Sequence, residues 1–125
     1  IQQDLERIKK LKKIKYNFNQ IGTIPTINEE HELIIYRIFQ EALHNSLKHS
    51  RSDLFDVNIE TTDSVFKLQL KDFGIGYDNK KSNSGLGLNN MRLRAKLIGA
   101  VLIINSDKTG TSVTIEYPLT QDHEN

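Results

Sequence analysis

The spacing of apolar residues along the chain predicts a series of helices separated by strands. Apolar residues recur every three or four positions in residues 1–12, 29–50 and 88–98, which predicts three amphipathic helices. Asn28 precedes three glutamates and is a suitable N-cap for the second helix. Gly99 follows the third pattern and is a suitable C-terminal cap.

Between these helices, apolar and polar residues alternate as they do in half-buried strands. The segment "IKYNFNQ" at residues 14–20 has this pattern. Further strands are expected at residues 54–61, 64–72, 100–106 and 111–119, the last two joined by a hairpin turn at "DKTG". Segregated helices and a mostly antiparallel, mixed sheet predict an α+β fold, a two-layer sandwich with helices on one face of the sheet.

Composition limits the class of protein. The 125 residues suffice for one domain, which we place at 13–119, between a connecting helix at 1–12 and a C-terminal tail at 120–125. A hydrophobic content of 37% and a net charge of +1 are ordinary for a soluble protein. Because cysteine is absent, disulfides and thiolate metal sites are excluded. No apolar run approaches the roughly 18 residues that span a bilayer, and no signal peptide is visible.

Basic residues are concentrated at the start of the chain. Residues 1–16 hold six of them, against the acidic Asp4 and Glu6. Such a run is typical of a solvated helix face, and few aromatic residues are interleaved with it. We therefore expect no nucleic-acid partner and no membrane contact by this domain.

The helix predicted at 29–50 carries the first candidate site. Glu41, Asn45 and Lys48 fall on one polar arc, with His49 beside it, and two isoleucines interrupt that arc. A carboxylate, an amide oxygen and a cation on a partly covered face suit Mg²⁺ with a polyphosphate, because magnesium prefers oxygen ligands and keeps several waters. The alternative is an ordinary amphipathic helix with a solvated face.

The second candidate site begins where a strand ends, in "DFGIGYD". Asp72 closes the strand, and Gly74 and Gly76 follow it. Glycines let the backbone approach a ligand closely. The letters D-F-G also occur in protein kinases, but this chain is short and has neither the upstream glycine-rich loop nor the H-R-D segment of those enzymes.

The glycine-rich segment continues to the next helix. "GLGL" at residues 85–88 opens that helix, and we expect Asn89 or Asn90 to cap it. A helix N-terminus after a glycine-rich loop offers unpaired N–H groups to phosphate. The alternative is a flexible hairpin loop.

Four segments, in this order, resemble one known family. "QEALHNSLKHS", "DFGIGYD", "GLGLNNMRLRA" and "GTSVTIEYPL" are similar to the N, G1 and G2 boxes and the terminal strand of the ATP-binding domain of sensor histidine kinases. That domain has the Bergerat fold, which gyrase, heat-shock chaperone and mismatch-repair ATPases share. "MRLRAKLIGA" is most similar to the short-lid subfamily whose partner regulators carry a LuxR-type output domain.

The resemblance implies ATP and Mg²⁺ as cofactors and a role for each motif. Asn45 would bind Mg²⁺, and Glu41 would orient a metal-bound water or act as the catalytic base. Lys48 and His49 would approach phosphate or ribose. Asp72 would accept a hydrogen bond from the adenine amino group.

The resemblance also assigns the glycines and the terminal strand. Gly74 and Gly76 would let the loop pack against the base, and Thr111 would contact the adenine edge through a water shared with Asp72. The lid over the phosphates would be formed by Gly85, Leu86, Gly87 and Leu88.

The partners implied by the resemblance lie outside these 125 residues. The γ-phosphoryl group would pass to a histidine on a dimerisation domain upstream in the full-length chain, and then to a response regulator. None of the four histidines of this sequence heads a dimerisation helix, and Phe73 stands where the family commonly has asparagine. We expect this domain to be cytoplasmic, with anchoring of the full-length protein in the plasma membrane left open. The alternatives are another ATPase or an anti-sigma-type serine kinase of the superfamily, or a degenerate ATP-sensing or protein-binding module that keeps the fold without catalysis.

Overall fold

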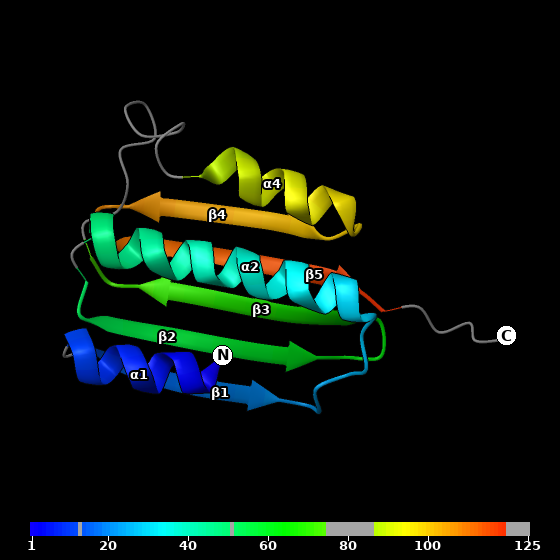
Figure 1. The fold of residues 1–125 in the computed structure, drawn as a ribbon, viewed down its shortest axis with the longest axis horizontal. Coiled ribbons are helices and arrows are strands. Elements are labelled where there is room, and N and C mark those ends of the chain that lie inside the picture. The colour runs from blue at the N-terminus through cyan, green and yellow to red at the C-terminus, as the bar shows by residue number, and fades with distance from the viewer. Residues whose placement is uncertain (13, 51, 75–86, 120–125) are drawn as a thin grey trace, which may run out of the picture.

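The computed structural model describes residues 1–12, 14–50, 52–74 and 87–119. Its elements, in chain order, are α1 (Gln2–Lys12), β1 (Lys15–Ile21), α2 (Glu29–Asn45), the π-helix η1 (Ser46–Ser50), β2 (Leu54–Thr61), β3 (Val65–Asp72), α4 (Leu88–Leu97), β4 (Val101–Asp107) and β5 (Gly110–Pro118) (Figure 1). The predicted order of helices and strands is confirmed.

The five strands form one sheet in the order β1-β2-β3-β5-β4. β1 and β2 are parallel, and the other three neighbouring pairs are antiparallel. Parallel strands cannot be joined by a tight turn, and α2 forms the connection between β1 and β2. The mixed, mostly antiparallel sheet is therefore as predicted.

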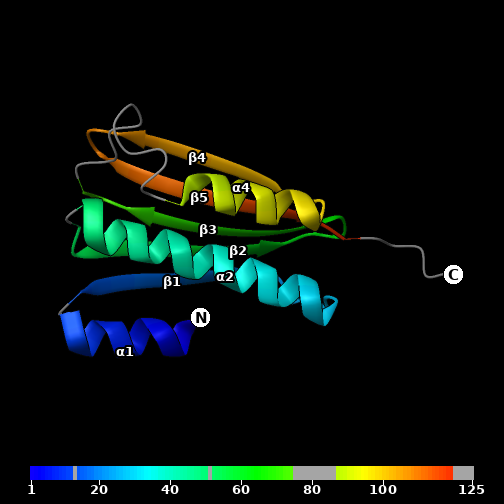
Figure 2. The same cartoon turned by 45° about the horizontal axis from the view of Figure 1, so that its top comes forward.

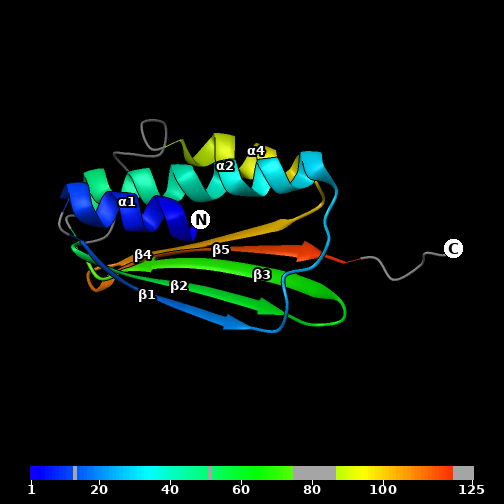
Figure 3. The same cartoon turned by 60° about the horizontal axis from the view of Figure 1, so that its bottom comes forward.

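The three α-helices of the described residues lie on the same face of the sheet, and the opposite face carries none of them (Figures 2 and 3). Strand residues that point towards the helices form the core with the apolar side of α2. Its buried members include Ile38, Phe39, Ala42, Phe55, Val57, Leu68 and Ile115. The predicted two-layer α+β sandwich is confirmed.

The helix α1 packs on this core through Leu5, which is completely buried. Ile14, just before β1, is buried in the same cluster. α1 therefore shares the layer of α2 and α4 on the sheet.

The helix ends differ in part from the prediction. Asn28 accepts hydrogen bonds from the N–H groups of Glu30 and His31, so its role as the N-cap of α2 is confirmed. The expectation that Asn89 or Asn90 caps α4 is wrong, because the N-cap is Gly87 with a φ of 70°. In the described residues, no helix has the length and apolar character needed to cross a membrane.

Candidate functional site

The candidate site is centred on Asp72, the last residue of β3, which is completely buried. Its Oδ1 accepts hydrogen bonds from the backbone N–H groups of Thr111, at 3.0 Å, and Gly74, at 3.1 Å. Its Oδ2 accepts a hydrogen bond of 2.6 Å from the hydroxyl of Ser46. A buried carboxylate is costly unless it is hydrogen-bonded, and these three donors, from β5, the following loop and η1, meet that need.

Among the residues that the structure describes, the hydrogen bonds leave part of this carboxylate's accepting capacity unused. An ionised carboxylate has about four lone-pair sites on its two oxygens. Three of these sites are used by Ser46, Thr111 and Gly74. The remaining capacity can accept a hydrogen bond from a ligand that carries an amino group.

The close approach of β5 to the end of β3 depends on Gly110. A Cβ at this position would lie 2.1 Å from the backbone oxygen of Asp72, and the φ of Gly110 is 142°. A side chain there would therefore clash with the backbone. The absence of one lets the next residue, Thr111, bring its N–H group to Asp72.

Thr111, which the resemblance places at the adenine edge, lies on β5 beside Asp72. It is buried, and its hydroxyl lies 2.8 Å from the hydroxyl of Ser106 on β4. The group that reaches Asp72 is its backbone N–H. The predicted contact between Thr111 and a nucleotide, through a shared water, stays a prediction.

A second part of the site brings Glu41 of α2 against the start of α4. A Cβ on Gly87 would lie 2.9 Å from Oε2 of Glu41. Gly87 also accepts the first backbone hydrogen bond of α4, from the N–H group of Met91. The carboxylate of Glu41 therefore lies next to a helix N-terminus, where unpaired N–H groups favour anions.

Asn45 occupies the last position of α2 and is 2% exposed. It lies one turn after Glu41, as predicted. The face of α2 that carries it is more buried than the helical spacing of apolar residues indicates. Ile38, which we placed on the polar arc, is completely buried as well. The predicted partial covering of this arc is confirmed for these two side chains.

The chain continues from Asn45 into η1, whose wider turn changes the direction of the side chains that follow. π-Helical turns occur often at functional sites. Lys48 is exposed and lines a hollow of about 370 Å³ with His44, Ser52 and Asp53. The expected contacts of Lys48 and His49 with phosphate or ribose stay predictions.

Two of the remaining predicted residues, Gly74 and Leu88, are among those that the structure describes. Gly74 is placed by its hydrogen bond to Asp72, and Leu88 is 2% exposed at the start of α4. Gly76, Gly85 and Leu86 lie outside the described residues.

Sequence reasoning missed the role of Ser46. The helical period places it on the apolar arc of α2, among core residues. A serine on an apolar arc needs a buried partner, since an unpaired buried hydroxyl is unfavourable. That partner is Asp72. The signal available in the sequence was a polar serine at a position on the apolar arc of the helix.

Phe73 had no role in the sequence analysis, and the structure gives it two contacts. Its backbone N–H group donates to the hydroxyl of Ser52, at 3.1 Å. Its ring is 43% exposed, and Nζ of Lys71 lies 5.2 Å from the ring centroid. Both contacts are made by the residue directly after Asp72, where β3 ends.

The chain is similar in sequence to proteins of one family. The family model described as "Histidine kinase-, DNA gyrase B-, and HSP90-like ATPase" matches residues 30–121. The chain is 33% identical over 111 residues to oxygen sensor histidine kinase NreB of Staphylococcus carnosus, covering 86% of this chain and 32% of the relative. It is 35% identical over 114 residues to signal transduction histidine-protein kinase/phosphatase DegS of Bacillus subtilis, covering 86% and 30%. The chain thus spans about a third of the length of these relatives.

A solved structure has the same fold. The Erythrobacter litoralis EL346 blue-light activated histidine kinase matches with a TM-score of 0.77 and 26% identity, over 94% of this chain and 40% of that chain. Acinetobacter baumannii histidine kinase AdeS is 14% identical with a TM-score of 0.75, over 95% of this chain and 61% of that chain, and shows likeness of fold alone.

Proposed function

This chain belongs to the histidine kinase-, DNA gyrase B- and HSP90-like ATPase family, and we propose that it is the ATP-binding catalytic domain of a two-component sensor histidine kinase. The observation that carries the proposal is the completely buried carboxylate of Asp72, held by three donors with accepting capacity left for a ligand amino group. The match to histidine kinases over 86% of the chain supports it.

Asp72 would recognise the base of ATP. The amino group of adenine is a donor, and a fixed, buried acceptor discriminates strongly against a purine that presents an acceptor there. The backbone hydrogen bonds from Thr111 and Gly74 fix the carboxylate in one orientation. Gly74 and Gly76 would let the loop pack against the base.

Asn45 and Glu41 would act at the phosphates. Asn45 would hold Mg²⁺ through its amide oxygen, and Glu41 would act as the base or orient a water. Mg²⁺, when bound, would neutralise charge on the phosphate oxygens. No three His, Cys, Asp or Glu side chains of the described residues form a metal-binding group, and Mg²⁺ on polyphosphates commonly uses only one or two protein ligands.

Lys48 and His49 would approach phosphate or ribose from η1. A lid would form over the phosphates, with its N–H groups next to the anionic oxygens. Its residues would be Gly85, Leu86, Gly87 and Leu88. The position of Gly87 at the start of α4, against Glu41, supports this part of the proposal.

The proposed reaction is in-line transfer of the γ-phosphoryl group to a histidine on a separate dimerisation domain. The bond between the γ-phosphorus and the bridging oxygen breaks, a P–N bond to the imidazole forms, and ADP leaves. The imidazole proton would pass to Glu41 or solvent. Catalysis would come from positioning and charge stabilisation, so the domain needs few reacting groups of its own.

The partners and the location follow from the same proposal. The phosphorylated histidine would lie in a dimerisation domain upstream in the full-length chain, and a response regulator, of the LuxR type, would receive the phosphoryl group. We propose that the domain works in the cytoplasm, where ATP is available.

Two measurements test the proposal in sequence. Calorimetric titration of the chain with ATP and Mg²⁺ should give a single binding site. Absence of binding at about 1 mM ATP, a concentration that corresponds to a binding free energy of roughly 4 kcal/mol, would contradict the proposal. Radiolabelled ATP and a separate dimerisation domain should then give an acid-labile phosphohistidine. Label on serine instead would favour an anti-sigma-type kinase, and binding without transfer would favour a sensing module.

A further inference from the structure

Three polar side chains form a row across one end of the sheet, on the face that the helices cover. Asp72, Thr111 and Ser106 come from β3, β5 and β4, which are neighbours in the strand order. Figure 1 shows these strand ends near the C-terminal end of α2. Ser106 is paired directly with Thr111 in the sheet, and it is the member of this row that has no role in the proposed function.

Hydrogen bonds connect the row from β3 to β4. Oδ1 of Asp72 accepts a hydrogen bond of 3.0 Å from the N–H group of Thr111. The hydroxyls of Thr111 and Ser106 lie 2.8 Å apart. Asp72 and Thr111 are buried, and Ser106 is half-buried. Because an unpaired hydroxyl is unfavourable away from water, the contact with Ser106 restrains the direction of the Thr111 hydroxyl.

The contact between the two hydroxyls allows two arrangements of their protons. A hydroxyl has one proton to donate and two lone pairs that accept, and either of these two oxygens can be the donor. If Thr111 donates to Ser106, Thr111 has only lone pairs to offer to a ligand. If Ser106 donates to Thr111, the proton of Thr111 stays available. The two arrangements therefore suit ligands with opposite hydrogen-bonding groups.

The base that Asp72 would recognise selects one of these arrangements. The amino group of adenine is a donor, and the ring nitrogen next to it, N1, carries no proton and is an acceptor. N1 therefore needs a donor, either directly or through a bridging water. The hydroxyl of Thr111 can supply it, because the N–H group of the same residue already holds Asp72. Only the arrangement in which Ser106 donates leaves this proton for the ligand.

We propose that Ser106 is a positioning residue for base recognition, which donates to the Thr111 hydroxyl and so directs the proton of Thr111 towards N1 of adenine or a water on N1. This inference rests on the proposed function of Asp72 and Thr111. These two residues then present an acceptor and a donor that match adenine. Hypoxanthine, with a carbonyl oxygen and a protonated N1, has the opposite groups and is rejected. Ser106 acts through Thr111 and needs no contact of its own with the nucleotide.

A pair of nucleotides isolates the contact with N1. 1-Deaza-ATP keeps the amino group and the phosphates of ATP but has a C–H group in place of N1. In calorimetry with Mg²⁺, the unsubstituted chain should bind 1-deaza-ATP about tenfold more weakly than ATP, since one hydrogen bond is lost. The ratio of the two dissociation constants is the readout, because a general loss of structure weakens both nucleotides together.

Substitutions at two serines locate the effect. Ser106→Ala removes the group that holds the Thr111 hydroxyl, so ATP should bind roughly fivefold more weakly while 1-deaza-ATP binds as before. The ratio should therefore fall towards one. Ser106→Thr keeps a hydroxyl at this position and should restore the ratio. Ser112→Ala is the matched control, because Ser112 follows Thr111 on β5 and points to the opposite face of the sheet. Its ratio should equal that of the unsubstituted chain.

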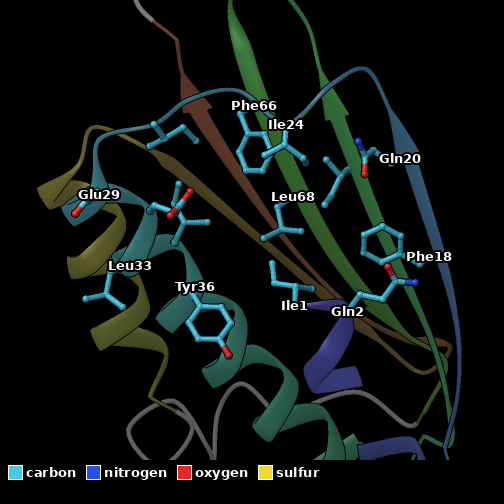
Figure 4. Close-up of a pocket in the computed structure, with 14 residues that line it drawn as sticks. Ile1, Gln2, Phe18, Gln20, Ile24, Glu29, Leu33, Tyr36, Phe66 and Leu68 are labelled. Carbon is cyan, nitrogen blue, oxygen red and sulfur yellow. The ribbon is translucent and has the colours of Figure 1, made fainter. Parts of the chain in front are cut away.

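NMR amide shifts show where the nucleotide binds. With ATP they should fall on the ends of β3, β4 and β5 that carry the row. Another hollow lies between α1 and α2, and its lining includes Phe18, Leu33 and Phe66 but no member of the row (Figure 4). Shifts concentrated at that hollow would contradict both the proposed function and the role of Ser106.

The outcomes distinguish this inference from the proposed function. Absence of ATP binding by the unsubstituted chain would overturn both. If ATP binds and Ser106→Ala leaves the ratio unchanged, only the role of Ser106 is overturned. Equal affinity of the unsubstituted chain for ATP and 1-deaza-ATP would show that N1 is not recognised. That result would overturn the inference and leave the proposed role of Asp72 intact.

Discussion

The hydroxyl of Ser46 donates a hydrogen bond of 2.6 Å to Oδ2 of Asp72, although the two residues are 26 positions apart in the chain. Both side chains are buried. The contact ties the end of the long helical segment to the end of β3. It therefore links the two motifs that the proposed nucleotide site needs.

Removal of this hydroxyl should weaken both the fold and the proposed nucleotide site. In Ser46→Ala, Asp72 loses one of its three donors, and a hydrogen bond to a charged group contributes about 1.5–3 kcal/mol. We expect the free energy of unfolding in urea to fall by about 2 kcal/mol, together with a lower affinity for ATP. The control is Ser112→Ala, which removes the hydroxyl of a serine on β5 that makes no hydrogen bond to Asp72. Equal effects of the two substitutions would contradict the role of Ser46.

Asp72→Asn should weaken the recognition of adenine without preventing folding. The carbonyl oxygen of asparagine can still accept from Thr111 and Gly74, so we expect the variant to fold. Its amide N–H group would face the adenine amino group as a second donor, and ATP affinity should fall by at least about 100-fold. Inosine triphosphate, which presents an acceptor at that position, is the comparison. The preference for ATP over inosine triphosphate should shrink in the variant, and an unchanged preference would assign adenine recognition elsewhere.

Asn45→Ala tests the proposed metal ligand. The buried amide lies one turn from Glu41, where it would act on the phosphates and leave the base untouched. Calorimetry should show that Mg²⁺-dependent binding of ADP weakens by about tenfold or more, whereas adenosine binds as before. A matched loss for adenosine and ADP would show that Asn45 supports the fold of the site and does not hold the metal.

Alanine substitutions at two glycines allow the cost of a steric clash to be distinguished from the cost of backbone strain. Gly110 and Gly99 both have positive φ, 142° and 72°, but only Gly110 has a backbone atom against its missing Cβ. Gly99→Ala should cost about 1–2 kcal/mol of unfolding free energy, from the left-handed conformation alone. Gly110→Ala should cost clearly more, because the clash is with the backbone of Asp72. Thermal unfolding of the two variants measures the difference, and equal costs would contradict it.

The β4–β5 turn should contribute a small, pH-dependent stability. The hydroxyl and N–H group of Thr109 donate to Asp107 and lower the pKa of this carboxyl from its ordinary value of 3.8. The charged form is favoured in the folded state, so the contribution is present above 3.8 and is lost as the pH falls through the lowered pKa. Asp107→Asn should therefore be less stable than the unsubstituted chain at neutral pH, and the two should converge in acid. Urea unfolding across this pH range measures the difference in unfolding free energy between the two proteins. A difference that is constant with pH would contradict the assignment.

Local patterns in the sequence determined the helices, the strands and the fold class. Hydrophobic period, the cap at Asn28 and the turn at 107–110 depend on residues near one another in the chain, so they can be predicted without a structure. The motifs around Asn45 and Asp72 were likewise visible as short segments. Their functional roles stay proposals that the experiments above test.

The contacts between distant segments were decided only by the tertiary structure. The pairing of Ser46 with Asp72 and the cap at Gly87 against Glu41 each require two elements to meet. Periodicity placed Ser46 with the apolar residues because it describes one helix in isolation and contains no information about its partner.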